Sequence, residues 1–449
     1  MSVVQAKTAY GSTRRGTPTI KKMRVVPVAG YDSMLLTLNG AHSPFFTRNL
    51  ILLTDSDDRT GAGEICGGDD LTRLLEGYIP LVEGREIGDY KNIIQSIGRY
   101  GRRRKEFKEG DKRAGQAEAA VEIALLDLLG QFMGQPVCAL LGNGQQRDSV
   151  SFQGRLFYVA DQERTTLPYL REDSPDAWFR QRRKTALTPS AIVEQARVLR
   201  NKYGFRSFKL EGGVFRAERE AEAALALKKE FPEAEISVVP SGSWKLEEAI
   251  EAARDLQGVV EYIEDPCGPE NGYSSREINA EFRLAAGIPV ATKMFADNWR
   301  QFYHAAVQKS ADIIFADPHI WSMNSSVRMA QVLCDWGLSW GACSDSHFDI
   351  SLAALTHCAA AAPGREPVIS SCWIWQDGQY LTENPPVIRE GQLDVPKCPG
   401  LGLKLDAEAI EKAHQLYLGL ESHARDDSLA MQCLIPGWSF DPKRPCLVR

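Results

Sequence analysis

The chain has 449 residues, with 53 lysines and arginines against 59 aspartates and glutamates, which gives a net charge of −6. Its 43% hydrophobic and 25% charged residues are typical of globular proteins and argue against a disordered chain, a collagen-like fibre or a basic nucleic-acid-coating protein. The apolar runs are too short for a membrane span, and Met1–Lys22 shows no secretory signal. We therefore expect a cytoplasmic protein with no nucleic-acid or membrane partner.

The ten cysteines are scattered along the chain and form no CxxC pair. This spacing argues against a zinc ribbon and against a thioredoxin-type motif. Disulfide frameworks are typical of short secreted chains rather than of a chain of this length. We expect reduced thiols, most of them buried as small apolar side chains.

The first third of the chain has the pattern of an α+β domain. Residues 1–21 are polar and are predicted to form a flexible N-terminal segment, followed by the α+β domain over 22–149. Strands are expected at 22–27, 33–38, 47–54 and 61–64, and helices at 71–82 and 117–133.

Residues 150–399 repeat a pattern of strand, loop and amphipathic helix. Strands are expected at 150–158, 207–210, 235–239, 259–264, 289–292, 312–316, 338–342 and 368–374. Helices are expected at 191–203, 217–231, 246–256, 276–286, 299–309, 325–336 and 350–361. Because alternating strands and helices give parallel strands with right-handed crossovers, eight of them indicate an α/β barrel rather than an open sheet. Residues 400–449 fall outside the repeat and are expected to return to the first domain.

Polar residues follow most of the predicted barrel strands, where such barrels carry their chemistry. The second strand ends in Lys209 and Glu211, and the fourth ends in Glu264. The fifth, sixth and seventh strands are followed by Lys293, Asp317, Cys343 and Asp345. For one such residue a solvated loop charge is the simpler explanation, but their convergence on one mouth favours a functional site.

Several segments resemble the glucarate dehydratase branch of the enolase superfamily, over nearly the whole chain from about residue 22. They are Ala41–Asn49 (AHSPFFTRN), Ala124–Gly130 (ALLDLLG), Tyr262–Gly268 (YIEDPCG), Ala316–His319 (ADPH), His347–Ala353 (HFDISLA) and Ile435–Cys446. The resemblance implies a modified (β/α)7β TIM-type barrel whose mouth is closed by an α+β capping domain. It also implies abstraction of a proton α to a carboxylate, an enediolate held on Mg²⁺ and loss of water.

The resemblance implies three oxygen ligands for Mg²⁺ and a Lys-x-Lys pair, and this chain departs from that pattern. Lys209 matches the first lysine, but Glu211 stands where the family has its lysine base. Glu264 is the single ligand kept, because Val239 and Lys293 occupy the other two ligand positions. Since valine offers no oxygen and an ammonium repels a dication, we predict that Mg²⁺ is not bound in the family manner and expect no other cofactor.

The remaining catalytic and substrate-binding positions are also altered. Asp317 matches the family's dyad aspartate, whereas Cys343 replaces its histidine. Lys209, Glu211, Asp317 and Cys343 are therefore the candidate catalytic residues, although Cys343 with His347 as a nucleophile and base is a weaker alternative. The candidate substrate-binding residues are Tyr31, Arg155, Lys293, Asp345, Cys372 and Arg425.

Complementary changes on neighbouring strands suggest ion pairs inside the altered site. We expect the Lys293 ammonium to occupy the emptied metal position and to pair with Glu264. Glu211 is expected to pair with Lys209 or Arg155, since an unpaired buried carboxylate is costly.

Two functions remain open from the sequence. One is a lyase that acts on a small-molecule acid sugar through an altered site, so that standard glucarate dehydration is not expected. The other is a catalytically inactive homologue that binds an acid sugar or partners an active subunit. A homo-oligomer is expected in either case.

Overall fold

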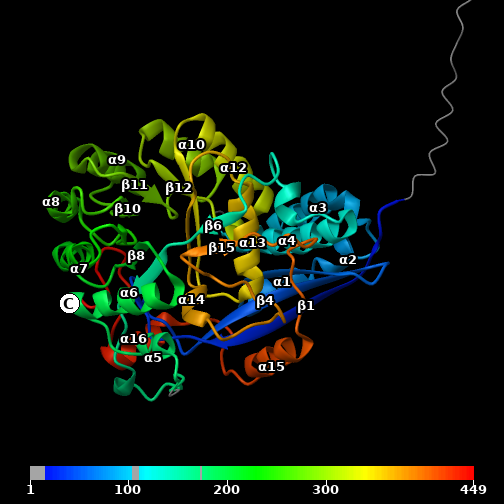
Figure 1. Cartoon of the computed structure of the whole chain (residues 1–449), viewed down its shortest axis with the longest axis horizontal. Coiled ribbons are helices and arrows are strands. Elements are labelled where there is room, and N and C mark those ends of the chain that lie inside the picture. Colours follow the sequence, from blue (N-terminus) through cyan, green and yellow to red (C-terminus); the bar gives the residue numbers. More distant parts are fainter. Residues whose placement is uncertain (1–15, 104–110, 172–173, 449) are drawn as a thin grey trace, which may run out of the picture.

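The computed structural model describes residues 16–103, 111–171 and 174–448, so that residues 1–15 of the predicted N-terminal segment lie outside the described part. An antiparallel cap sheet of three strands opens the chain (Figure 1): β1 (Ile20–Tyr31), β4 (Phe45–Asp55) and β5 (Thr60–Cys66), in the order β1-β4-β5. In the central strand, Ile51 lies opposite Val25 on one side and Gly63 on the other. The predicted meander is confirmed, with β1 starting at Ile20.

Two predictions for the cap region are wrong in detail. The strand expected at 33–38 is reduced to β2 (Leu36–Thr37), which pairs with β3 (Gly40–Ala41). The helix expected at 71–82 is divided into α1 (Asp69–Glu76) and α2 (Ile79–Val82), because Pro80 has no N–H to continue the helical hydrogen bonds. The helix α3 (Tyr90–Arg102) was not expected at all.

The helix α4 (Arg113–Met133) packs so closely against β5 that two glycines of that strand are required. A Cβ atom on Gly61 would lie 2.3 Å from the Ala124 carbonyl oxygen, and one on Gly63 would lie 2.1 Å from the Ala120 carbonyl oxygen. Neither contact can be made without moving a backbone. The α4 helix, predicted from its apolar spacing, is therefore fixed against the sheet by residues that look unremarkable in the sequence.

Gly63→Ala is expected to lower the free energy of unfolding by roughly 2 kcal/mol, since the added methyl group overpacks the contact between β5 and α4. Urea denaturation followed by circular dichroism would measure the change. Gly115→Ala, in α4 itself, is the matched control, because its Cβ would meet only the Ile320 carbonyl oxygen at 3.6 Å. Alanine is also favoured over glycine in a helix. Equal stability of the two variants would contradict the tight contact.

Eight parallel strands form the barrel, in the order β14-β13-β12-β11-β10-β9-β8-β7. They are β7 (Gly154–Phe157), β8 (Ser207–Glu211), β9 (Glu235–Val239), β10 (Tyr262–Glu264), β11 (Val290–Thr292), β12 (Ile313–Phe315), β13 (Ser339–Ser344) and β14 (Val368–Ser371). A parallel bridge between Gln153 and Ser370 brings the first and last strands together. The predicted barrel is confirmed.

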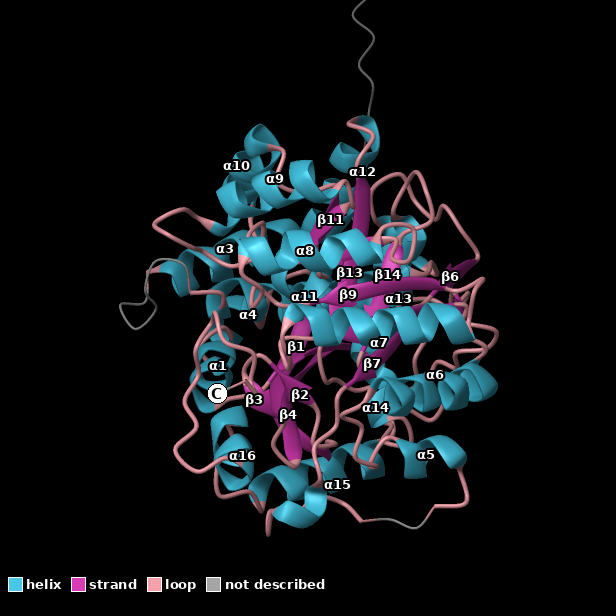
Figure 2. Cartoon of the chain, turned by 90° about the vertical axis from the view of Figure 1, so that its left-hand side faces the viewer, coloured by secondary structure: helices cyan, strands magenta, loops and turns pink. Residues whose placement is uncertain are grey.

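Helices surround this barrel on its outside (Figure 2). They are α6 (Pro189–Tyr203), α7 (Ala217–Glu230), α8 (Leu246–Leu256), α9 (Ser275–Ala286), α10 (Trp299–Gln308), α12 (Met323–Asp335) and α13 (Asp349–Ala361), with the short α5 (Ala177–Gln181) and α11 (Pro318–Trp321) in the loops. Each long helix was expected from its apolar spacing, with bounds that differ by at most two residues.

The first and last predicted barrel strands are longer than those observed. The segment expected over 150–158 is divided into β6 (Ser149–Ser151), which pairs with β15 (Gln392–Asp394), and the barrel strand β7. The strand expected over 368–374 ends at Ser371, and α14 (Trp373–Gln376) follows. All four side chains of α14 are buried, whereas a strand would send alternate side chains to opposite faces.

The chain after the barrel contacts both the cap sheet and the barrel. The helix α15 (Ala407–Leu418) packs against β1, where the Pro27 carbonyl oxygen lies 2.6 Å from His414 Nδ1. The helix α16 (Asp427–Leu434) packs against β3. The final residues reach the loop after β8, where the Cys446 N–H donates to the Gly213 carbonyl oxygen.

A buried glutamate joins the cap sheet to a barrel helix. The carboxylate of Glu64, in β5, accepts 2.8 Å hydrogen bonds from the N–H groups of Phe348 and Ser351 at the start of α13. It also accepts one from Arg48 Nε at 2.8 Å. Burial alone would raise the pKa of Glu64, but the Arg48 guanidinium and the two N–H groups hold it below its ordinary value. The first turn of α13 is thus capped by a charge from another part of the chain.

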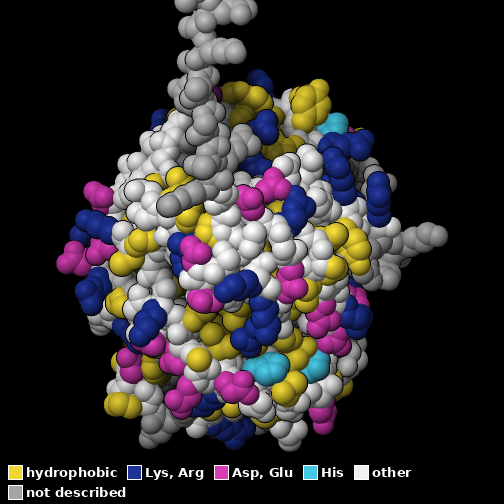
Figure 3. Space-filling model, turned by 90° about the vertical axis from the view of Figure 1, so that its right-hand side faces the viewer, with side chains coloured by type: hydrophobic (Ala, Val, Ile, Leu, Met, Phe, Trp, Pro, Cys, Tyr) yellow, Lys and Arg dark blue, Asp and Glu magenta, His cyan; other side chains and the backbone are white. Residues whose placement is uncertain are grey.

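On the face drawn in Figure 3, lysines and arginines are interspersed with aspartates and glutamates. None of the helices in the described ranges combines the length and the apolar character needed to cross a membrane. All ten cysteines lie in those ranges as free thiols.

Candidate functional site

A pocket of about 440 Å³ lies at the carboxyl ends of the barrel strands. Its rim comes from the loop after β2 and from Phe440 and Pro442 near the end of the chain. The predicted site residues that line it are Arg155, Glu211, Val239, Glu264, Lys293, Cys343 and Asp345. The strand order therefore brings together side chains that are far apart in the sequence, the most distant being Arg155 and Asp345, 190 positions apart.

Five further predicted site residues do not line this pocket within the described part of the chain. Lys209, Asp317 and Cys372 are buried and contact residues of its wall. The ring of Tyr31 packs on Phe45 with centroids 5.3 Å apart. Arg425 Nη2 donates to Asp427 at 2.7 Å, and Arg425 Nη1 lies 3.9 Å from Asp32. Substrate-binding roles for Tyr31 and Arg425 stay predictions.

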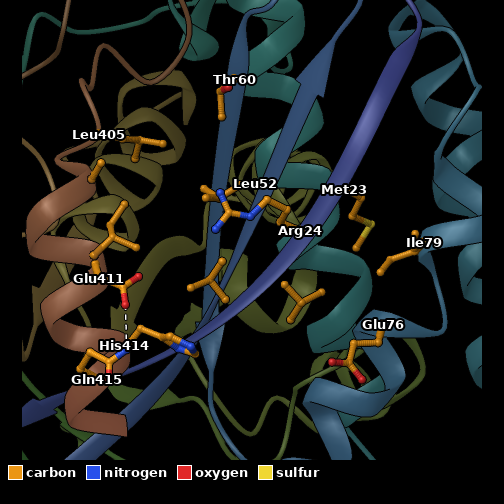
Figure 4. A pocket seen from close by; sticks show the side chains of 14 residues that line it. Met23, Arg24, Leu52, Thr60, Glu76, Ile79, Leu405, Glu411, His414 and Gln415 are labelled. Atoms are coloured by element: carbon orange, nitrogen blue, oxygen red, sulfur yellow. Dashed lines mark hydrogen bonds between the residues drawn. The ribbon is translucent and has the colours of Figure 1, made fainter. Parts of the chain in front are cut away.

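A larger cavity of about 840 Å³ lies away from the barrel mouth, on the cap sheet (Figure 4). Arg24 of β1 and Leu52 of β4 form its floor, between α15 on one side and α1 and α2 on the other. Glu411 and Gln415 hydrogen-bond to each other at its edge. This larger cavity is not the candidate site, because its lining residues include no cluster of buried ionisable side chains like the one at the barrel mouth.

The deepest ion pair of the mouth joins Lys209 to Glu264, and both side chains are almost fully buried. The Lys209 ammonium also lies 4.4 Å from the centre of the Phe315 ring, a cation–π contact. Burial alone would lower the pKa of Lys209, but the neighbouring Glu264 carboxylate raises it above its ordinary value. The expected pair between Lys293 and Glu264 is therefore wrong: another lysine takes this carboxylate.

The second pair, between Arg155 and Glu211, confirms one of the two expected partners of Glu211. Arg155 Nε and Nη2 lie 2.8 and 2.7 Å from the same Glu211 oxygen, Oε1. Arg155 Nη1 donates to the Ser344 carbonyl oxygen and to Cys372 Sγ, both at 2.9 Å. Burial raises the pKa of the Cys372 thiol, so the sulfur accepts this bond as a neutral group.

Lys293 faces two carboxylates on the next strands rather than Glu264. Its Nζ lies 3.4 Å from Asp345 Oδ2 and 3.8 Å from Asp317 Oδ2. Asp317 Oδ1 in turn accepts hydrogen bonds from the His319 backbone N–H at 2.9 Å and lies 2.8 Å from His319 Nδ1. The aspartate of the expected dyad is therefore held by its own loop, since Cys343 offers it no imidazole.

A nucleophilic cysteine finds no support in the geometry. Burial raises the pKa of the Cys343 thiol to about 12, so that it stays protonated. His347, the proposed base, has Nε2 at 3.1 Å from Ser344 Oγ and 2.7 Å from Ser371 Oγ. Burial also lowers the pKa of His347 to about 4. Its second nitrogen, Nδ1, donates to the Phe348 carbonyl oxygen, which leaves the imidazole neutral and structural.

Sequence reasoning missed Asp265, which shapes the wall of the pocket. Its carboxylate accepts hydrogen bonds from Thr292 Oγ1 at 2.6 Å and from the N–H groups of Lys293 and Met294 at 3.0 and 3.1 Å. Burial and the adjacent Glu264 raise its pKa to about 7. Asp265 has a φ of 46°, a strained conformation that clusters at functional sites. Only its place next to Glu264 could have drawn attention to it.

The residues at the mouth do not fit Mg²⁺ in the family manner. Mg²⁺ requires near-octahedral oxygen ligation. Here the Glu264 carboxylate is neutralised by an internal ammonium, Val239 supplies methyl groups, and Lys293 supplies a second ammonium. Across the described ranges, no three histidine, cysteine, aspartate or glutamate side chains come together as a metal site.

Comparison with known proteins places this geometry in a family. Residues 191–409 match the family model "Enolase C-terminal domain-like". A probable glucarate dehydratase from Streptomyces coelicolor is 31% identical over 436 residues, which cover 94% of this chain and 97% of that protein. The chain therefore belongs to the enolase superfamily, and within it to the glucarate dehydratase-like proteins.

Solved structures of similar proteins agree with this assignment. An enolase from Mycobacterium smegmatis complexed with tartrate has a TM-score of 0.86 at 31% identity, covering 96% of this chain and all of that one. An enolase from Pseudomonas fluorescens with bound magnesium, potassium and tartrate has a TM-score of 0.87 at 30% identity, covering 95% of this chain and 99% of that one. The expected modified TIM-type barrel with an α+β capping domain is confirmed.

Proposed function

We propose that this protein binds an acid sugar at the barrel mouth without Mg²⁺ and does not carry out Mg²⁺-dependent glucarate dehydration. One observation carries the proposal: the buried Lys209 ammonium is paired with Glu264, the one ligand of the family pattern that the chain keeps. A metal ion would have to displace that ammonium and accept Val239 and Lys293 as its other neighbours. Tartrate, a hydroxy-dicarboxylate, is bound in two structures at 30 and 31% identity, which supports the ligand class.

The second candidate is a lyase that uses catalytic groups other than those of the family pattern. Glu211 lines the pocket as a carboxylate that could accept a proton. Its ion pair with Arg155 favours the binding role over this one, since two guanidinium nitrogens hold the carboxylate at Oε1 and a base must be positioned on the substrate proton. The homo-oligomeric state stays a prediction. The exposed side chains of Tyr303 and Val307, four residues apart in α10, support it, because neighbouring apolar groups on a surface often mark an interface.

Titration calorimetry with Mg²⁺ and a panel of hexarates and aldonates would test the proposal. We expect no micromolar Mg²⁺ binding, no 2-keto product with or without Mg²⁺, and thermal stabilisation by at least one acid sugar. Micromolar Mg²⁺ binding that disappears in Glu264→Gln would refute the metal-free site. Formation of a 2-keto acid without Mg²⁺ would support the lyase instead.

A further inference from the structure

Asp345, directly after β13, places an exposed carboxylate between two cations of the mouth. Its Oδ2 lies 3.4 Å from Lys293 Nζ, and its Oδ1 lies 3.8 Å from Arg155 Nη1. The Asp345 side chain is 72% exposed, against 18% for Lys293 and 6% for Arg155. The carboxylate therefore faces the open space of the pocket and is not packed into its wall.

Both contacts of this carboxylate are loose compared with the pair beneath it. Arg155 Nη2 approaches Glu211 to 2.7 Å, within the usual range of about 2.7–2.9 Å for a charge-assisted hydrogen bond. The separations of 3.4 and 3.8 Å at Asp345 exceed that range. The Lys293 ammonium, which is also 3.8 Å from Asp317, therefore keeps donor capacity that no short bond uses.

Among the described residues of the mouth, Asp345 has two cation contacts but no short ion pair. Lys209, Arg155 and Lys293 face the carboxylates of Glu264, Glu211 and Asp317, and Asp345 is a further carboxylate beside Arg155 and Lys293. The Lys293 ammonium, followed by the Arg155 guanidinium, holds the pKa of Asp345 well below its usual range. Because Asp345 stays ionised at neutral pH, a second anion entering the pocket meets a like charge in its way.

We infer that Asp345 is an internal competitor: its carboxylate occupies the place of a ligand carboxylate between Lys293 and Arg155, and it turns outward when the ligand binds. The inference rests on the proposed function and adds to it the ligand group that is recognised and the residues that receive it. The high exposure of Asp345 makes the outward turn possible without unpacking the wall. The ligand carboxylate then replaces one anion by another, so the charge beside Lys293 and Arg155 is unchanged.

Calorimetric titration with tartrate tests the competitor directly. Asp345→Asn is expected to bind tartrate at least about tenfold more tightly than the unmodified protein, because the like charge is gone and the side of Lys293 and Arg155 that faced it can receive the ligand carboxylate. Lys293→Met in the same background is expected to lose that gain. Asp441→Asn is the matched control, since it changes the net charge equally, while its carboxylate contacts the Lys443 N–H and Arg444 and not the two cations. Its affinity should stay within about twofold of the unmodified protein.

The outcomes separate the competitor from the proposed function. If the unmodified protein binds tartrate and Asp345→Asn binds it equally or less tightly, the competitor is refuted while acid binding stands. If Asp345→Asn binds tartrate and the unmodified protein does not, the Asp345 carboxylate prevents binding altogether, which supports the competitor. If neither binds at tens of millimolar tartrate, both ideas fail. Thermal unfolding of Asp345→Asn verifies that the variant is folded, and a tartrate complex with Asp345 still beside Lys293 would also refute the displacement.

Discussion

Glu264→Leu is expected to destabilise the protein by about 3–5 kcal/mol, because it leaves the buried Lys209 ammonium without a partner. The free energy of unfolding from urea titration, together with the melting temperature, would measure the loss. A buried cation beside the Phe315 ring and the Cys343 thiol has no other carboxylate at contact distance in the described part of the chain. The expected loss of stability therefore comes from the unpaired charge and not from the change in side-chain size.

The double variant Glu264→Leu with Lys209→Met is the matched control for this effect. Replacing both members of a buried ion pair by apolar residues of similar volume is often neutral or stabilising. We expect the double variant to recover most of the lost stability, so that the two substitutions are strongly non-additive. Equal instability of the single and double variants would mean that packing, and not the ion pair, dominates at this position.

His357→Gln is expected to change stability in a pH-dependent way. His357, in α13, accepts a 3.3 Å hydrogen bond from the Cys138 N–H at Nδ1 and lies 3.2 Å from the Leu401 carbonyl oxygen at Nε2. These partners require a neutral imidazole that carries its proton on Nε2. Burial accordingly lowers the pKa of His357 from 6.5 to about 4. Only the unfolded chain therefore takes up this proton between about pH 6.5 and 4.

The sign of the effect follows from proton linkage. Because the unfolded state binds more protons in this range, His357 lowers the stability of the protein as the pH falls. The loss amounts to about 2.5 kcal/mol between pH 7.5 and 4.5, at about 1.36 kcal/mol per pKa unit. His357→Gln should be less stable than the unmodified protein at pH 7.5, since the Cys138 N–H loses its acceptor, and should regain about that amount by pH 4.5. Urea denaturation at both pH values measures the difference, and the exposed His304→Gln should show no such change.

Much of the fold could be predicted because its signals are local. The alternation of strands with amphipathic helices repeats along the barrel, and each repeat is readable on its own. The errors fall where distant contacts decide the structure. The end of β14 depends on how the Trp375 ring packs on Phe157 and Trp178, and those residues come from other parts of the chain.

Seven of the twelve predicted site residues line the pocket, and the ion pairs among them were only partly predictable. Arg155 and Glu211 lie on the adjacent strands β7 and β8, where Phe157 is opposite Glu211, so their side chains can meet on one face. Lys209 and Glu264 lie on strands that are not neighbours, and they meet across the interior of the barrel. Lys209 pairs with Ser237 in the sheet, two residues before Glu211, and its side chain extends toward the carboxyl ends of the strands. No spacing in the sequence reveals which of two lysines has the depth to reach Glu264.

The glutamate that joins β5 to α13 has a consequence for how the molecule can be divided. Glu64 supplies the negative charge that the N-terminus of α13 prefers, and this helix begins immediately after the loop that carries Asp345 and His347. A barrel excised from this chain would lose that charge and expose the first turn of α13 beside its own mouth. We therefore expect the two regions to unfold together, although they are separate in the sequence. The loop that carries Asp345 is therefore held in part by Glu64, in a strand nearly three hundred residues earlier in the chain.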